Sequence, residues 1–225
     1  MIRTRFSRRR CSLSILSLLV GIALSPGAQA QSLTTFFNSN NGNSQGGGVF
    51  FDLNAVSALT LTSLGVNVNV GTADPGSISL GAPISLEVWT RSGTATGFEG
   101  SAAGWTLRST GSGVAAAINT PSLVDITDFV LGSGITGMAI HNIGYIAQYT
   151  GTTLEPPPSV FFSNVDLSLS AGSATNDFFV GGTVRKPRVW NGTIFYTGGF
   201  VGPEPGTLAL VALGMVGGIV ARRRK

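Results

Sequence analysis

Alternation of apolar and polar residues is the feature that most limits how this chain can fold. Leu59-Thr60-Leu61-Thr62, Gly65 to Val70 and Ile84 to Thr90 all alternate in this way. Successive side chains of a β-strand point to opposite faces of a sheet, so the pattern is typical of half-buried strands. No amphipathic helical pattern of useful length accompanies it between residues 31 and 200. The body of the chain is therefore predicted to be all-β.

Further strand candidates recur every 10 to 20 residues, separated by Gly, Asn, Ser and Pro. They are Leu33–Phe37, Val49–Leu53, Trp105–Arg108, Ile135–His141, Val160–Ser163, Val165–Ser170 and Val189–Tyr196. Short strands at this spacing favour an antiparallel β-sandwich with jelly-roll or Greek-key connections. We predict one such domain over residues 31–200, and we find no internal repeat within it.

The first 30 residues read as a secretory signal peptide. Five arginines between Arg3 and Arg10 precede the apolar run Cys11–Leu24, and Ala28 and Ala30 place small residues at −3 and −1. Cleavage after Ala30 would leave Gln31 as the first residue and would remove the only cysteine. Three consecutive arginines leave the twin-arginine route open, but no cofactor motif follows, which favours the general secretory route.

The last 25 residues, 201–225, have three parts in a fixed order. The segment Pro203-Glu204-Pro205 comes first, uncharged Gly206–Ala221 follows, and the basic residues Arg222, Arg223, Arg224 and Lys225 end the chain. A helix over the 16 uncharged residues would span about 24 Å. That is short of a hydrocarbon core of roughly 30 Å, but snorkelling cations and local thinning can make up the difference. We predict a transmembrane helix over 206–221 with residues 222–225 in the cytoplasm, because a buried core helix would show a polar face.

This arrangement resembles the PEP-CTERM sorting signal of exported proteins from Gram-negative bacteria that make extracellular polysaccharide. The resemblance implies that exosortase, a membrane-embedded transpeptidase, recognises and removes the tail. The protein would then be anchored in the inner membrane transiently and would end at the cell surface or outside the cell. Phrases such as Val49-Phe50-Phe51-Asp52-Leu53 and Pro187-Arg188-Val189-Trp190-Asn191 also resemble a domain that recurs in secreted bacterial proteins. That second resemblance implies a β-sandwich and no particular activity.

Most of the positive charge lies in the predicted signal peptide and in the C-terminal tail. The whole sequence is +4, but nine of its 14 basic residues belong to the signal peptide and the tail. Residues 31–202 keep five basic and nine acidic residues, a net charge of −4. We therefore expect no nucleic-acid partner.

Few residues in the body are suited to catalysis. His141 is the only histidine, no G-x-S-x-G sequence occurs, and we expect a satisfied histidine near a strand end. The sequence thus predicts no enzyme, no cofactor and no metal, although a pair of carboxylates is not excluded. Asp125 to Asp128 and Asn176-Asp177 could offer oxygen ligands to calcium from turns, but turn and capping roles are the preferred interpretation.

Three tryptophans are the remaining binding candidates. Trp89, Trp105 and Trp190 lie in or beside predicted strands, where they either pack in the core or stack on sugar rings. Trp89 alternates with Leu86 and Val88 and should face away from them, which makes it the best surface candidate. Our first hypothesis is an exported surface or extracellular-matrix protein with a non-catalytic sandwich. The alternative is a module that binds the cell's own exopolysaccharide, and a hydrolase comes third.

Overall fold

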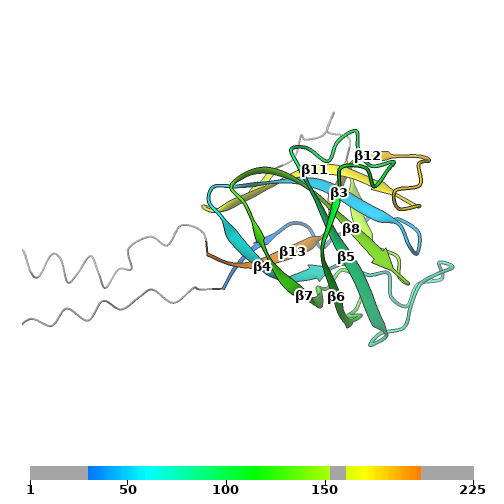
Figure 1. Cartoon of the computed structure of the whole chain (residues 1–225). Coiled ribbons are helices and arrows are strands. Elements are labelled where there is room, and N and C mark those ends of the chain that lie inside the picture. The colour runs from blue at the N-terminus through cyan, green and yellow to red at the C-terminus, as the bar shows by residue number, and fades with distance from the viewer. Residues whose placement is uncertain (1–29, 153–160, 199–225) are drawn as a thin grey trace, which may run out of the picture.

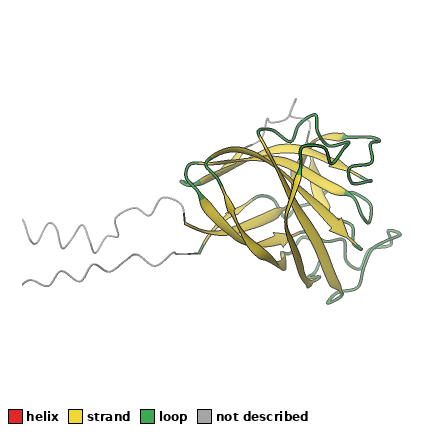
Figure 2. Cartoon of the chain, in the orientation of Figure 1, coloured by secondary structure: helices red, strands yellow, loops and turns green. Residues whose placement is uncertain are grey.

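The computed structural model describes residues 30–152 and 161–198, and its regular elements in these ranges are all strands (Figures 1 and 2). They are β1 (Gln31–Thr34), β2 (Asn41–Gly42), β3 (Gly48–Ala55), β4 (Leu59–Val66), β5 (Pro83–Ser92), β6 (Thr106–Val114), β7 (Ser122–Leu131), β8 (Gly134–Ile143), β9 (Gln148–Gly151), β10 (Phe161–Ser163), β11 (Leu167–Thr175), β12 (Arg185–Trp190) and β13 (Gly192–Gly198). No helix in these ranges is long and apolar enough to cross a membrane. The predicted signal peptide and transmembrane helix lie outside the described residues.

The strands hydrogen-bond as one sheet in the order β1-β13-β4-β7-β6-β5-β8-β3-β11-β12-β9-β2, with β10 beside β11. The ladders between these named strands are antiparallel. The sheet curls strongly, so that its two halves face each other across the core in an open half-barrel (Figure 1). The prediction of an all-β, antiparallel body is confirmed. A sandwich of two separate sheets is not confirmed, because the ladder continues from one half into the other through β5 and β8.

Alternation along the strands separates the core from the outer face. In β5, Ile84, Leu86 and Val88 are buried, while Glu87 and Trp89 point outward and are partly exposed. The inner side chains of the other strands join them in one large apolar cluster that fills the curl. Burial of apolar surface contributes roughly 25 cal/mol per Å², so this cluster is the main source of stability in a body that has no cysteine.

The predicted strand Val189–Tyr196 is in fact two strands that meet at Asn191. Before this residue β12 pairs with β9, and after it β13 pairs with β1 and β4. Trp190 lies in the core and stacks on Phe51 of β3, with ring centroids 5.0 Å apart. One chain segment thus links the two ends of the curled sheet, as strands that switch partners do at sheet corners.

The strand β7 was not predicted, and the interpretation of Asp125 and Asp128 as turn residues is wrong. Both acids lie inside β7 with exposed side chains, between buried Val124, Ile126 and Phe129. These two residues are polar because their side chains lie on the solvent-exposed outer face of the strand. The short strands β2 and β9 were missed as well.

Gly192 provides a test of the strand junction. A Cβ atom at this position would fall within the indole ring of Trp190. We expect Gly192→Ala to displace the tryptophan and to lower the free energy of unfolding by about 1–3 kcal/mol or more. Gly132→Ala is the matched control, because a Cβ there meets no atom within 4 Å. Urea unfolding of the two variants measures the effect, and equal midpoints would contradict it.

Candidate functional site

A second aromatic cluster lies on the outer face of β3, β8 and β5, away from the main core. Its buried members are Phe50, Ala95, Trp105 and Ala139, and Trp89, Phe178 and Phe179 pack against them. The segments between β5 and β6 and between β11 and β12 supply Trp105 and the two phenylalanines, so two loops cover this part of the sheet. Phe179 has a φ of 57°, a left-handed conformation that a bulky residue rarely adopts.

The loop between β5 and β6 is held by carboxylates. Asp52 accepts hydrogen bonds from the Thr94 hydroxyl, at 2.7 Å, and from the Ala95 backbone N–H, at 2.6 Å. Buried Glu99 accepts hydrogen bonds from the Gly97 N–H, at 2.8 Å, and from the Ser173 hydroxyl, at 2.9 Å. These bonds satisfy two acids within the fold, and they fix the loop over the sheet.

Glu87 lies at the border of the aromatic cluster and brings the histidine into it. Its Oε2 accepts hydrogen bonds from Trp89 Nε1, at 3.0 Å, and from His141 Nδ1, at 2.9 Å. Glu87 and His141 are direct neighbours across β5 and β8. The imidazole also stacks on Phe178, with centroids 4.4 Å apart and planes 2° from parallel. One ring nitrogen and one ring face of His141 are therefore already engaged.

The environment of Glu87 has opposing effects on its pKa. Partial burial raises the pKa, because it disfavours the charged carboxylate. Hydrogen bonds from His141 and Trp89, with the positive charge of a protonated His141, outweigh burial, and the pKa lies below its ordinary value. Glu87 is thus held as an acceptor, an unsuitable state for donating a proton near neutral pH.

An open hollow of ≈ 530 Å³ lies beside this pair on the outer face of the sheet. Mainly polar residues line it: Ser85, Leu86, Glu87, Thr110, Gly111, Ser112, Asp125, Ile126, Thr127 and Ile143. Hydroxyls and two carboxylates on a broad surface can hydrogen-bond a polar ligand. Among the described residues, no hydroxyl is hydrogen-bonded to His141, whose side-chain hydrogen bond is to Glu87.

The predicted site residues lie in quite different surroundings. Trp190 is in the core, and Trp105 is 7 % exposed, with its indole N–H donated to the Phe98 carbonyl at 2.9 Å. Of the three tryptophans only Trp89 is partly exposed, and Phe179 packs edge-on against it at 5.4 Å. The sugar-stacking hypothesis therefore narrows to Trp89. Sequence reasoning missed its partner Glu87, although the spacing of Glu87 and Trp89 on one strand face was visible.

The remaining predicted residues fall at or beyond the ends of the body. Gln31, predicted to follow the signal peptide, begins β1, and Ala30 is exposed. Ala28, Pro203, Glu204, Pro205 and the basic residues 222–225 lie outside the described residues. Within the part of the chain that the structure describes, no three or more His, Cys, Asp or Glu residues gather as metal ligands.

Comparison with known proteins identifies the end of the chain. A family profile described as a PEP-CTERM protein-sorting motif matches residues 203–225. The chain therefore carries the sorting signal that its tail predicts, as expected of an exosortase substrate. The motif implies export with processing at the membrane. No curated protein matches the chain.

The lowered pKa of Glu87 predicts a pH-dependent contribution to stability. A carboxylate with a lower pKa in the folded state stabilises the fold above the unfolded pKa, and this contribution is lost as pH falls through the folded pKa. We expect Glu87→Gln to cost less than about 1 kcal/mol at pH 7, since the pair is partly exposed. The difference from wild type should close between about pH 5 and pH 3.

Urea unfolding at pH 7, 5 and 3 measures this difference. Asp128→Asn is the control, because this exposed acid on β7 has no hydrogen bond among the described residues. A Glu87→Gln penalty of the same size at pH 3 would contradict the assignment.

Proposed function

We propose that this chain is an exported, exosortase-sorted protein whose body is a non-catalytic domain displayed at the cell surface or in the extracellular matrix. The match of residues 203–225 to the sorting motif carries the proposal. Within the described residues the last strand, β13, ends at Gly198, and the matched segment begins at Pro203.

The order of segments in the tail supports a defined topology. Cations after an apolar helix remain on the cytoplasmic side, which puts Pro203-Glu204-Pro205 at the outer surface of the inner membrane. Proline has no backbone N–H, and it disfavours helix in the residue before it. Both effects disfavour a helix over the motif, so we expect a membrane enzyme to read it as an extended segment with Glu204 as its single charge. The membrane and exosortase are the partners that this topology requires.

The surroundings of His141 support a non-catalytic body. A general base needs a ring nitrogen within reach of the proton it takes. Glu87 holds Nδ1 of the only histidine, which leaves Nε2 for that role, but no hydroxyl of the described residues is hydrogen-bonded to the imidazole.

Removal of the tail tests the proposal. In a host with exosortase, we expect the wild-type protein to lose its C-terminal segment, which intact mass measures directly. Glu204→Ala, or replacement of residues 222–225 by serine, should leave full-length protein. The control is the same protein in a host without exosortase. Equal, unprocessed masses in both hosts would mean that the tail is only an anchor.

A second candidate function, carbohydrate binding, rests on the position of Trp89 beside a polar hollow. Sugar-binding surfaces combine an aromatic face with hydrogen-bonding groups, and Glu87, Thr110 and Asp125 line the neighbouring hollow.

If Trp89 stacks on a glycan, Trp89→Ala should weaken binding to polysaccharide from the producing cell by about 1–3 kcal/mol, by analogy with bases stacked on aromatic side chains. Affinity electrophoresis measures the loss, and circular dichroism checks the fold. Phe36→Ala, at an exposed aromatic residue before β2, is the control. A folded Trp89→Ala protein with unchanged affinity would eliminate this candidate.

A further inference from the structure

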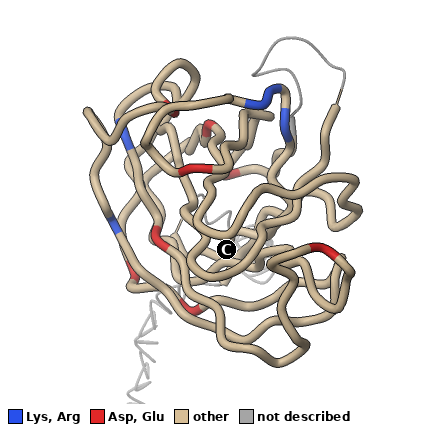
Figure 3. The backbone as a smooth tube through the Cα atoms, turned by 90° about the vertical axis from the view of Figure 1, so that its right-hand side faces the viewer, with Lys and Arg blue, Asp and Glu red and all other residues tan. Residues whose placement is uncertain are grey.

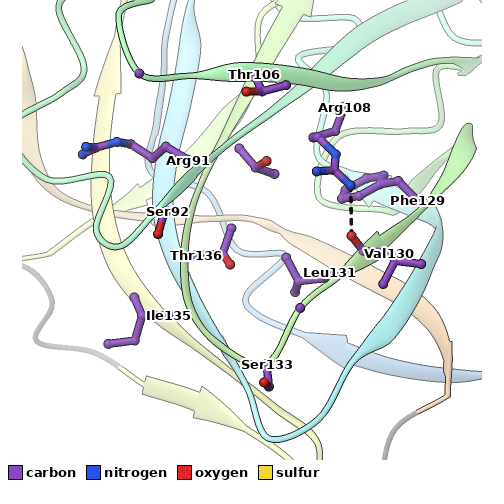
Figure 4. A pocket seen from close by; sticks show the side chains of 13 residues that line it. Arg91, Ser92, Thr106, Arg108, Phe129, Val130, Leu131, Ser133, Ile135 and Thr136 are labelled. Atoms are coloured by element: carbon purple, nitrogen blue, oxygen red, sulfur yellow. Dashed lines mark hydrogen bonds between the residues drawn. The ribbon is translucent and has the colours of Figure 1, made fainter.

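A different hollow opens where the sheet is incomplete. The ladder between β6 and β7 joins only Gly111–Gly113 to Val124–Ile126. Beyond it, side chains bridge the two strands: Ser109 donates its hydroxyl to the Thr127 carbonyl at 2.7 Å, and Arg108 Nη2 donates to the Val130 carbonyl at 3.1 Å. The separated strand ends and the β7–β8 turn enclose a hollow of ≈ 320 Å³ (Figure 4). This volume is at the lower end of the range for small-molecule sites, roughly 300–1,000 Å³.

Hydroxyl groups line this hollow and lack protein partners. They belong to Thr90, Ser92, Thr106, Ser133 and Thr136. None of these side chains has a hydrogen bond to another described residue, whereas Ser109 next to the hollow does. Thr90 is only 8 % exposed, but its hydroxyl oxygen is not among the fully buried unpaired atoms of the described residues, so it is open to the hollow. A ligand rich in hydroxyls would supply the missing partners.

The hollow is positively charged, because Arg108 lines it and no acidic residue does. Arg108 is held by the Val130 carbonyl and lies over the Phe129 ring, 5.4 Å from its centroid. Arg91 also borders the hollow, but it donates to the Thr94 carbonyl, and its guanidinium lies over Phe98 and points away from Arg108 in Figure 4. No Asp or Glu lines the hollow. The other basic residues of the described body, Arg185, Lys186 and Arg188, lie along β12 (Figure 3).

From this combination we infer that the Arg108 hollow binds one sugar-acid unit, a ring that carries a carboxylate and several hydroxyls. The guanidinium has a planar set of N–H donors, and those not used by Val130 match a carboxylate. The free hydroxyls hydrogen-bond the ring hydroxyls, and the largely buried Phe129 and Leu131 form the apolar part of the lining. This site is separate from Trp89, and it depends neither on tail processing nor on the second candidate function.

Titration of purified full-length protein in detergent tests the inference, with binding followed by ligand-observed NMR. The probes are glucuronate, a short oligouronate, glucose and acetate. We expect glucuronate to bind more tightly than glucose, which lacks the charge, and than acetate, which lacks the hydroxyls. Arg108→Gln should weaken glucuronate about tenfold or more, and Arg108→Lys should weaken it less. Thr90→Val should weaken glucuronate and glucose alike.

Matched controls separate this site from the rest of the surface. Arg185→Gln removes an exposed arginine from β12 and should leave glucuronate binding unchanged. Melting temperatures establish that each variant is folded. Oligouronate bound more tightly than the monomer would identify a polysaccharide end as the source, and equal affinity would identify a free sugar acid; both support the inference. Absence of glucuronate binding, acetate binding as tight, or a folded Arg108→Gln protein with full affinity would overturn it.

Discussion

The junction at Trp190, Asn191 and Gly192 is the constraint on which the curled sheet depends. Trp190 fills the core against Phe51, while the next two backbone units connect strands from both ends of the sheet. The Asn191 carbonyl accepts the Asn67 N–H, at 3.2 Å, and Gly192 exchanges hydrogen bonds with Thr35 through its N–H and its carbonyl. The Asn191 side chain accepts the Thr150 hydroxyl at 2.9 Å. A residue larger than glycine at 192 would have to displace Trp190. The path of the chain through this junction and the packing of the core therefore depend on each other.

The outer aromatic cluster limits what the candidate site can do. Phe178 and Phe179 pack against the sheet from a loop, and His141 and Glu87 stand at the edge of that contact. The only histidine is therefore part of the packing that holds the loop in place. Since Glu87 is an acceptor for Trp89 and His141, a change in its protonation alters its hydrogen bonds to the two side chains against which the loop packs. These contacts hold Trp89, Glu87 and His141 in fixed positions on the outer face of the sheet.

The sequence predicted most strands because apolar residues of the inner face alternate with polar residues of the outer face, as from Ile84 to Thr90. It failed where polarity had two explanations: Asp125 and Asp128 resemble turn residues, although they occupy the outer face of β7. It also could not show that Val189–Tyr196 changes partners at Asn191, because partner choice is a long-range property. The contact between Glu87 and His141, which are 54 positions apart, likewise depends on a long-range pairing, that of β5 with β8. The Arg108 hollow had no sequence signal, since it results from a ladder that ends early between β6 and β7.

The two ends of this chain are basic, whereas its body is net negative. Most basic residues belong to the predicted signal peptide and to the sorting tail. A net negative body can bind an anion only where the fold places a basic side chain away from acidic ones. Arg188 donates to the adjacent Pro187 carbonyl and lies over Tyr149, and Arg91 is occupied by Thr94 and Phe98. Arg108 borders the same hollow as Arg91, and there its one hydrogen bond, to the Val130 carbonyl, replaces a missing rung of the sheet. The same gap in the ladder thus creates the space and orients the charge within it.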